Sequence, residues 1–152
     1  MVSTIALVVI ILDQISKFLI ASNMYVQQDI PVIQKFFHIT YLQNTGMAWS
    51  LLSGFQILLS LAAVVAIGVM IWYLLAKRPD RITSISLSLM IGGAAGNLID
   101  RLFLGYVRDF LHFYIWGYDF PVFNIADCAL CIGVFILIIA TWQEERKEQK
   151  TK

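Results

Sequence analysis

Long apolar stretches alternate with short polar ones along this chain, and four of the apolar stretches are long enough to cross a membrane. Residues 55–76 carry no charge and are followed by the polar run 77–81. Three further stretches, residues 2–21, 82–101 and 122–142, are interrupted by only a few ionisable side chains. Because about 20 helical residues cross the core of a bilayer, the pattern predicts four membrane-spanning helices.

The composition supports a membrane protein over a soluble one. Of the 152 residues, 59% are hydrophobic and 14% are charged, and the net charge is +1. A soluble domain of this size has too small an interior for so much apolar surface, and a nearly neutral chain has no field that attracts nucleic acid. We therefore expect one membrane domain, residues 1–152, with lipid rather than nucleic acid as its surroundings. A cleavable signal peptide at residues 1–12 is disfavoured, because a basic start and a small-x-small cleavage site are missing.

Basic residues predict the orientation, because they gather in cytoplasmic segments of membrane proteins. They cluster in the turn at 77–81 and in the tail at 143–152. Both termini are therefore expected in the cytoplasm, and the connections 22–54 and 102–121 outside it.

The two outer connections are rich in aromatic and β-branched residues, which are typical of strands and of membrane interfaces. The first is expected to form a small β-structured platform and the second a short interfacial segment, so the predicted fold is an all-α integral membrane protein with this platform. The residues that carry this prediction are Phe36, Phe37, Ile39, Tyr41 and Trp49 in the first connection, and Tyr106, Phe110, Tyr114 and Trp116 in the second.

Ionisable residues inside the predicted helices are the main functional signal, since each costs at least about 2.5 kcal/mol in hydrocarbon. Counted from the cytoplasmic end at about 1.5 Å per residue, Asp13 lies roughly 18 Å and Asp100 roughly 27 Å along its helix. Asp127 lies about 9 Å inside the outer surface, because its helix runs the other way. Three helices are thus expected to bring carboxylates toward the outer face.

Helical spacing sorts these polar residues into groups, because residues three or four apart share a face. Asp13 with Lys17 reads first as an ion pair within one helix, and Asn97, Asp100 and Arg101 as a polar seam between helices. Asp127 shares a face with Asn124 but has no basic residue within a turn. Its partners must therefore come from another part of the chain.

Five short motifs occur in a fixed order on this four-helix pattern. In this order and spacing the chain resembles the lipoprotein signal peptidase family, also called signal peptidase II, over nearly its whole length. Arg108 and Met47 depart from the residues that are more common in the family. The motifs are Asp13-Gln14-Ile15-Ser16-Lys17, Asn44-Thr45-Gly46-Met47-Ala48-Trp49, Gly96-Asn97-Leu98-Ile99-Asp100-Arg101, Val107-Arg108-Asp109-Phe110 and Phe123-Asn124-Ile125-Ala126-Asp127.

The resemblance implies that Asp109 and Asp127 are a catalytic pair, whereas the residues alone do not favour Asp109 over Asp100. It implies cleavage of a precursor just before a diacylglyceryl-modified Cys, in the bacterial cytoplasmic membrane and near its outer face, by a monomer in contact with phospholipid and without a metal or cofactor. Two carboxylates at one site do not both ionise easily, so one can hold a proton while the other activates water. The supporting residues are Asp13, Lys17, Asn44, Asn97, Asp100, Arg101 and Asn124.

Rival chemistries are weaker. Cys128 and Cys131 have C-x-x-C spacing, but they lie inside a predicted helix, away from His38 and His112, and are read as packing residues. Ser16 and Lys17 are neighbours on a helix and point about 100° apart, which disfavours a Ser-Lys pair.

Two glycines indicate how the predicted helices pack, and two alternative functions remain to be considered. Gly92 and Gly96 are read as a close helix contact. A proton- or ion-coupled transporter is the main alternative function, although a conduction path needs polar groups through the whole bilayer. A non-catalytic membrane adaptor is a third reading.

Overall fold

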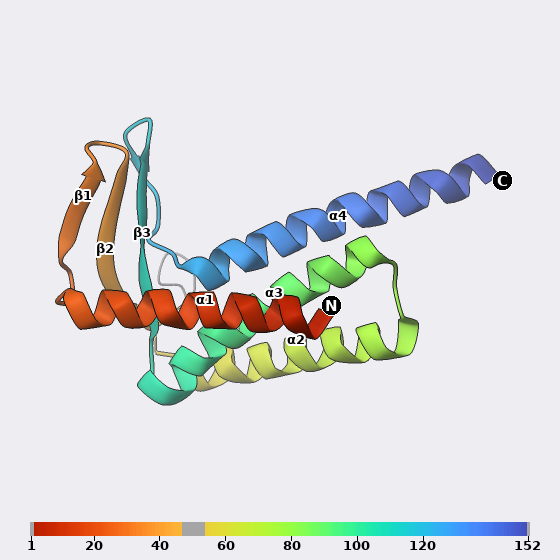
Figure 1. Cartoon of the computed structure of the whole chain (residues 1–152), viewed down its shortest axis with the longest axis horizontal. Coiled ribbons are helices and arrows are strands. Elements are labelled where there is room, and N and C mark those ends of the chain that lie inside the picture. The colour runs from red at the N-terminus through yellow and green to blue at the C-terminus, as the bar shows by residue number, and fades with distance from the viewer. Residues whose placement is uncertain (1, 47–53, 152) are drawn as a thin grey trace.

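A computed structural model describes residues 2–46 and 54–151 of the chain (Figure 1). Four described helices are long and apolar enough to cross a membrane, which confirms the predicted spans. Met47 and Trp49, named in the sequence analysis, lie outside the described residues. The elements in chain order are α1 (Val2–Asn23), β1 (Asp29–Ile33), β2 (Phe37–Asn44), α2 (Gln56–Lys77), α3 (Arg81–Leu104), β3 (Val107–Ile115), β4 (Tyr118–Asp119) and α4 (Ile125–Thr151).

Helix α3 is the centre of the bundle and contacts α1, α2 and α4. Its glycines allow this close packing. A Cβ at Gly92 would lie 2.8 Å from Val9 Cβ of α1, and a Cβ at Gly96 would lie 2.5 Å from Asp13 Oδ2. Since real Cβ atoms do not approach neighbours so closely, both positions require glycine, which confirms the predicted helix contact.

The strands form one antiparallel sheet in the order β1-β2-β3-β4, and the sheet lies across one end of the helices (Figure 1). The β-structured platform is thereby confirmed. The connection 102–121, expected as a short interfacial segment, supplies β3 and β4 to the same sheet. Its aromatic and β-branched residues alternate along a strand that pairs with β2, a partner that interfacial composition does not reveal.

Helix boundaries differ from the predicted ones where capping residues act. Helix α3 continues to Leu104 and ends at Gly105, whose φ of 78° suits glycine and whose N–H bonds to Arg101 O. Helix α4 begins at Ile125 rather than at 122, so Asp127 lies in its first turn, nearer the helix end than the predicted 9 Å. The predicted tail at 143–152 is helical as far as Thr151, because its charged residues are good helix formers.

Chain direction brings the functional elements to one end of the molecule. The end of α1, the end of α3 and the start of α4 all adjoin the sheet, whereas the first residues of α1 and the last of α4 lie at the far end (Figure 1). The short turn between α2 and α3 also lies at the far end. The polar residues of three helices and two strands therefore meet beneath the sheet.

Candidate active site

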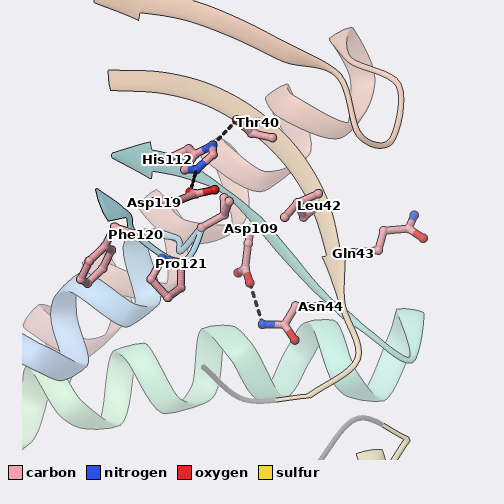
Figure 2. Close-up of a pocket in the computed structure, with 10 residues that line it drawn as sticks. Thr40, Leu42, Gln43, Asn44, Asp109, His112, Asp119, Phe120 and Pro121 are labelled. Atoms are coloured by element: carbon pink, nitrogen blue, oxygen red, sulfur yellow. Dashed lines mark hydrogen bonds and ion pairs between the residues drawn. The ribbon is translucent and has the colours of Figure 1, made fainter. Parts of the chain in front are cut away.

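Asp109 projects from β3 and is held by two amides. Asn44 Nδ2, at the end of β2, donates to Asp109 Oδ2 at 2.8 Å (Figure 2). Asn124 Nδ2 donates to Asp109 Oδ1 at 2.6 Å. The residue is only 3% exposed. Burial, and after it the negative charge of Asp127, raises the pKa of Asp109 to about 7, against the smaller lowering effect of the two amide hydrogen bonds. This carboxyl group is therefore suited to exchange a proton near neutral pH.

Asp127 lies in the first turn of α4 and forms part of a helix cap. Its Oδ2 accepts from the backbone N of Asn124 at 3.1 Å, while Asn124 Oδ1 accepts from the backbone N of Asp127 at 3.0 Å. This reciprocal pair is a capping box, with Asn124 as the cap and an Asp at the third helical position. Asp127 Oδ1 accepts from Asn97 Nδ2 of α3 at 2.8 Å. The partner that the sequence could not locate is thus an amide of another helix.

Asn124 joins the two carboxylates. Its side-chain amide bonds to Asp109 and its backbone N–H bonds to Asp127, so both carboxyl groups lie within hydrogen-bond reach of one residue. Among the described side chains, no Lys, Arg or His nitrogen lies within 4.0 Å of either carboxylate. The hydrogen bonds that the described residues donate to the pair therefore all come from neutral amide groups.

A β-bulge in β3 sets the direction of the side chains at the site. The backbone N–H groups of Phe110 and Leu111 both donate to Phe123 O, at 3.0 and 2.8 Å. In a regular strand, the side chains of residues three apart point to opposite faces of the sheet. A bulge between such residues adds one residue to the strand, so that their side chains point to the same face. Asp109 and His112 accordingly line the same cavity.

The cavity beside Asp109 measures about 490 Å³ (Figure 2). One wall comes from β2 and the other from the segment that follows β3. Polar and apolar side chains are mixed along it, as in a site for an extended peptide. The lining residues are Thr40, Leu42, Gln43, Asn44, Asp109, His112, Asp119, Phe120, Pro121 and Val122.

A second polar cluster lies deeper, between α1 and α3. Lys17 Nζ is 2.8 Å from Asp13 Oδ2 and 3.7 Å from Asp100 Oδ2, and all three side chains are fully buried. Lys17 also donates to Asn97 Oδ1 at 2.9 Å, which leaves the amide of Asn97 directed at Asp127. The predicted ion pair and polar seam are both present, and Lys17 aligns a residue that touches the carboxylate pair.

Asp13 has a further contact that its sequence position did not reveal. Its Oδ1 accepts from the backbone N of Ala126 at 2.9 Å, one of the free N–H groups at the start of α4. Asp13 therefore fixes the start of the helix that carries Asp127, and the missing Cβ of Gly96 leaves room for it.

Arg108 and Gln14 complete this deeper cluster, and no functional role for either was predicted. Arg108 donates to Asp100 through its backbone N at 3.0 Å, through Nε at 3.1 Å and through Nη2 at 2.7 Å. Gln14 Nε2 donates to Asp13, to Gly96 O and to Asp100. Arg108 thus pairs with Asp100 and not with its neighbour in the sequence, Asp109.

Arg101 lies near the carboxylate pair without an ion pair to it. Its Nη2 donates to Gly46 O at 3.1 Å, and the backbone N of Gly46 donates to Asn44 Oδ1 at 2.8 Å. Arg101 therefore supports the loop that follows β2 and, through it, the amide that bonds to Asp109. The nine predicted site residues are thus four carboxylates, three asparagines that donate to Asp109 or Asp127, and two cations. Of the cations, Lys17 lies within 4.0 Å of Asp13 and Asp100, whereas Arg101 bonds to the loop after β2.

The rival sites have no matching geometry. Within residues 2–46 and 54–151, no three His, Cys, Asp or Glu residues are grouped as a metal site. Cys128 is half-buried and Cys131 is exposed on the face of α4. Ser16 Oγ donates to Asp13 O at 2.8 Å, while Lys17 is engaged elsewhere. These contacts agree with the packing roles expected for the cysteines and argue against a Ser-Lys pair.

The fold and site define a class: a membrane protein with four candidate spans and a small sheet, in which two carboxylates share one asparagine and one of them, Asp109, lines a cavity. A family model described as signal peptidase (SPase) II matches residues 5–143. The lipoprotein signal peptidase of Halothermothrix orenii is 44% identical over 146 residues, which cover 96% of this chain and 98% of that protein. The lipoprotein signal peptidase of Anoxybacillus flavithermus is 42% identical over 95% of this chain and 87% of that protein.

Solved structures agree with this assignment. Two structures described as bacterial membrane enzymes match with TM-scores of 0.88 and 0.83. The first is 37% identical over 93% of this chain and 87% of that one, and the second is 38% identical over 91% and 90%. The chain belongs to the signal peptidase II family and is a protease of the bacterial membrane. Membership in a peptidase family argues against the transporter and the adaptor.

Proposed function

We propose that the chain removes the signal peptide from lipid-modified precursors, cleaving just before a diacylglyceryl-modified Cys, with Asp109 and Asp127 activating a water. The single observation that carries the mechanism is the arrangement of the two carboxyl groups. Both are held by the same asparagine and by further amides, without a cation. This arrangement allows the pair to keep one proton, which paired acid and base chemistry requires.

The chemistry follows from the shared proton. The ionised carboxylate takes a proton from a water held between the two groups, and the water attacks the scissile carbonyl. The protonated carboxyl group polarises that carbonyl and then helps to protonate the leaving amine. The pair titrates as a unit, and burial of Asp109 favours retention of its proton near pH 7.

The surroundings suit a peptide that carries lipid. The peptide would lie in the cavity between β2 and residues 119–122, beside Asp109. The acyl chains would remain among membrane phospholipids between the helices, and this binding would position the scissile bond. All residues of the proposed site come from one chain, in agreement with a monomer.

Basic residues support an active site at the outer face with both termini in the cytoplasm. Lys77, Arg78 and Arg81 lie at the short turn opposite the sheet, and Arg146 stacks on Trp142 at 4.1 Å near the end of α4. This charge distribution supports a cytoplasmic location for the far end of the bundle, and the aromatic ring is typical of a membrane interface.

Cleavage of a diacylglyceryl-modified precursor by purified protein in detergent tests the proposal. Asp109→Asn and Asp127→Asn should each lower kcat by about 100-fold or more, because each removes one half of the acid-base pair. Asp80→Asn is a matched control, since Asp80 is an exposed carboxylate at the far end. A metal chelator should leave the rate unchanged. Substantial cleavage by a folded Asp109→Asn or Asp127→Asn variant would show that the pair is wrongly assigned.

A further inference from the structure

A chain of polar side chains crosses the sheet beside the carboxylate pair. His112 Nε2 lies 2.6 Å from Asp119 Oδ1, and His112 Nδ1 lies 2.9 Å from Thr40 Oγ1 (Figure 2). Thr40 Oγ1 donates to Asp29 Oδ1, and the other oxygen of Asp29 lies 2.7 Å from His38 Nδ1. Four strands are therefore linked through one histidine, which is itself 7% exposed.

The protons available for hydrogen bonds among these side chains can be counted. A threonine hydroxyl has one proton, and Thr40 gives it to the carboxylate of Asp29. Thr40 can therefore only accept from His112, which requires a proton on Nδ1. The carboxylate of Asp119 can likewise only accept, which requires a proton on Nε2. A histidine that donates from both nitrogens is an imidazolium.

Asp29 is the residue on which this count depends, because a protonated Asp29 would release the hydroxyl of Thr40. The hydrogen bond from Thr40 lowers the pKa of Asp29 below its usual value, with smaller contributions from His38 and His112 against burial. Asp29 thus remains a carboxylate, and Thr40 remains an acceptor for the ring.

The charged and titratable groups that face His112 come from every strand of the sheet. Asp119 lies on β4, and Asp29 Oδ1 of β1 lies 3.9 Å from Nδ1. His38 of β2 has its ring centre 6.2 Å away, and Tyr114 of β3 has its ring centre 4.5 Å away. Asp109 lines the same cavity.

His112 lies between the two walls of the cavity and contacts both. Thr40 belongs to the β2 wall of the cavity and Asp119 to the opposite wall, and both line it together with His112 (Figure 2). Both ring nitrogens are engaged with the protein, so neither is available to bind a substrate. His112 instead ties one wall to the other, three residues from Asp109.

We propose that His112, as an imidazolium, is a positioning residue that sets the separation of the two walls and thereby the affinity for the peptide. This inference rests on the proposed function, because the cavity is taken as the peptide site. Removal of either hydrogen-bond partner breaks one of the two ties, so KM should rise while kcat, which depends on the carboxylate pair, stays nearly unchanged.

Two readouts test this positioning role. The first is the ¹⁵N and ¹H NMR signature of the His112 ring over about pH 5 to 8, where histidines titrate. In the native protein both ring nitrogens should be protonated at the acidic end. Thr40→Val should leave only Nε2 protonated at a pH where the native ring carries both protons, and Thr40→Ser should restore the native signature.

The second readout is the kinetics of precursor cleavage. His112→Gln and Thr40→Val should each raise KM about three- to fivefold, the change expected when one partly exposed charged contact is lost. In both variants kcat should stay within about twofold of the native value. Thr40→Ser should restore KM. Lys35→Gln is the control, because Lys35 is exposed in the turn between β1 and β2 and does not line the cavity, and its KM should match the native value.

The outcomes separate this inference from the proposed function. A native ring with only one protonated nitrogen throughout this pH range overturns the inference whatever the activity, because the NMR readout needs no turnover. An unchanged KM in folded His112→Gln, beside normal cleavage by the native protein, overturns the positioning role alone. Absence of cleavage by native protein overturns the proposed function and, with it, the role assigned to the walls.

Discussion

Two groups of carboxylates lie at the same end of this molecule, and their partners differ. Asp13 and Asp100, between α1 and α3, face the cations Lys17 and Arg108. Asp109 and Asp127, where the sheet meets α4, are held only by amide donors among the described side chains. The first group is neutralised by cations in direct contact, whereas no described cation lies within 4.0 Å of the second group, which can be neutralised by a proton.

The difference teaches how a buried carboxylate is assigned to structure or to chemistry. A carboxylate beside a cation remains ionised and contributes to the fold as half of a pair. Two carboxylates near each other with amides alone share a proton, and that proton is available to a substrate. A search for buried acids in a membrane would find all four, and only their partners distinguish the two groups.

Removal of a cation from the first group should have the largest effect on stability. Lys17→Met would leave two buried carboxylates with less compensation, and breaking a buried pair costs about 3–5 kcal/mol in the free energy of unfolding. The midpoint of thermal unfolding in detergent should therefore fall strongly. Activity should fall as well, because Asn97 would lose the contact that directs its amide toward Asp127.

The opposite result is expected from the second group. Asp127→Asn removes a buried carboxylate that no described cation compensates, so the midpoint of unfolding should stay the same or rise while activity is lost. If Asp127→Asn and Lys17→Met lowered the midpoint equally, the distinction between the two groups would not hold.

The pH dependence of stability sharpens the comparison. Because the pKa of Asp109 is about 7 in the folded chain against a reference of 3.8, the unfolded chain releases this proton first as pH rises. Stability should therefore be highest near pH 4 and fall toward pH 7, by about 4 kcal/mol at most. Above pH 7 the shared proton is lost, and kcat/KM should fall about tenfold per pH unit.

Unfolding midpoints of native protein and of Asp109→Asn across this pH range check the sign. The slope should shrink in Asp109→Asn. In Asp80→Asn the curve should instead shift in parallel between about pH 5 and 8. The hydrogen bond from Thr83 lowers the pKa of Asp80, so its contribution is already complete above its reference value of 3.8. A slope that survives in Asp109→Asn would place the titrating group elsewhere.

The sequence predicted those parts of the fold that depend on local pattern. The four spans follow from apolar length, and the contacts of Asp13 with Lys17 and of Asn124 with Asp127 follow from helical spacing. The choice of Asp109 came from the family resemblance, because a residue in a connection has no helical face from which to argue.

Long-range contacts could not be predicted in this way. The cap that Asp13 provides for Ala126 joins residues 113 positions apart, and no local pattern records it. The bulge at Phe110 and Leu111 depends on Phe123, so the common side of Asp109 and His112 was also hidden. His112 was considered only as a metal ligand, and its cavity position needed the sheet register.

Substitution of Arg108 should have the smallest effect on stability, and it tests whether the two groups of carboxylates are independent. Its bonds to Asp100 raise the pKa of its guanidinium, and Lys17 remains 3.7 Å from the same carboxylate when Arg108 is removed. Arg108→Leu should therefore cost about 2 kcal/mol in the free energy of unfolding, the range for lost hydrogen bonds to a charged group. This cost is smaller than that of Lys17→Met.

Arg108→Lys should fall between native and Arg108→Leu, because lysine keeps the charge but loses the two-nitrogen contact. In both variants kcat should stay within about twofold of native, since neighbours on a strand point to opposite faces and Arg108 has no contact with Asp109. Thermal unfolding and precursor cleavage measured on the same samples separate the two quantities. A large fall in kcat without a change in stability would mean that the charge of Arg108 acts on the proposed catalytic pair, and that the two groups of carboxylates are coupled.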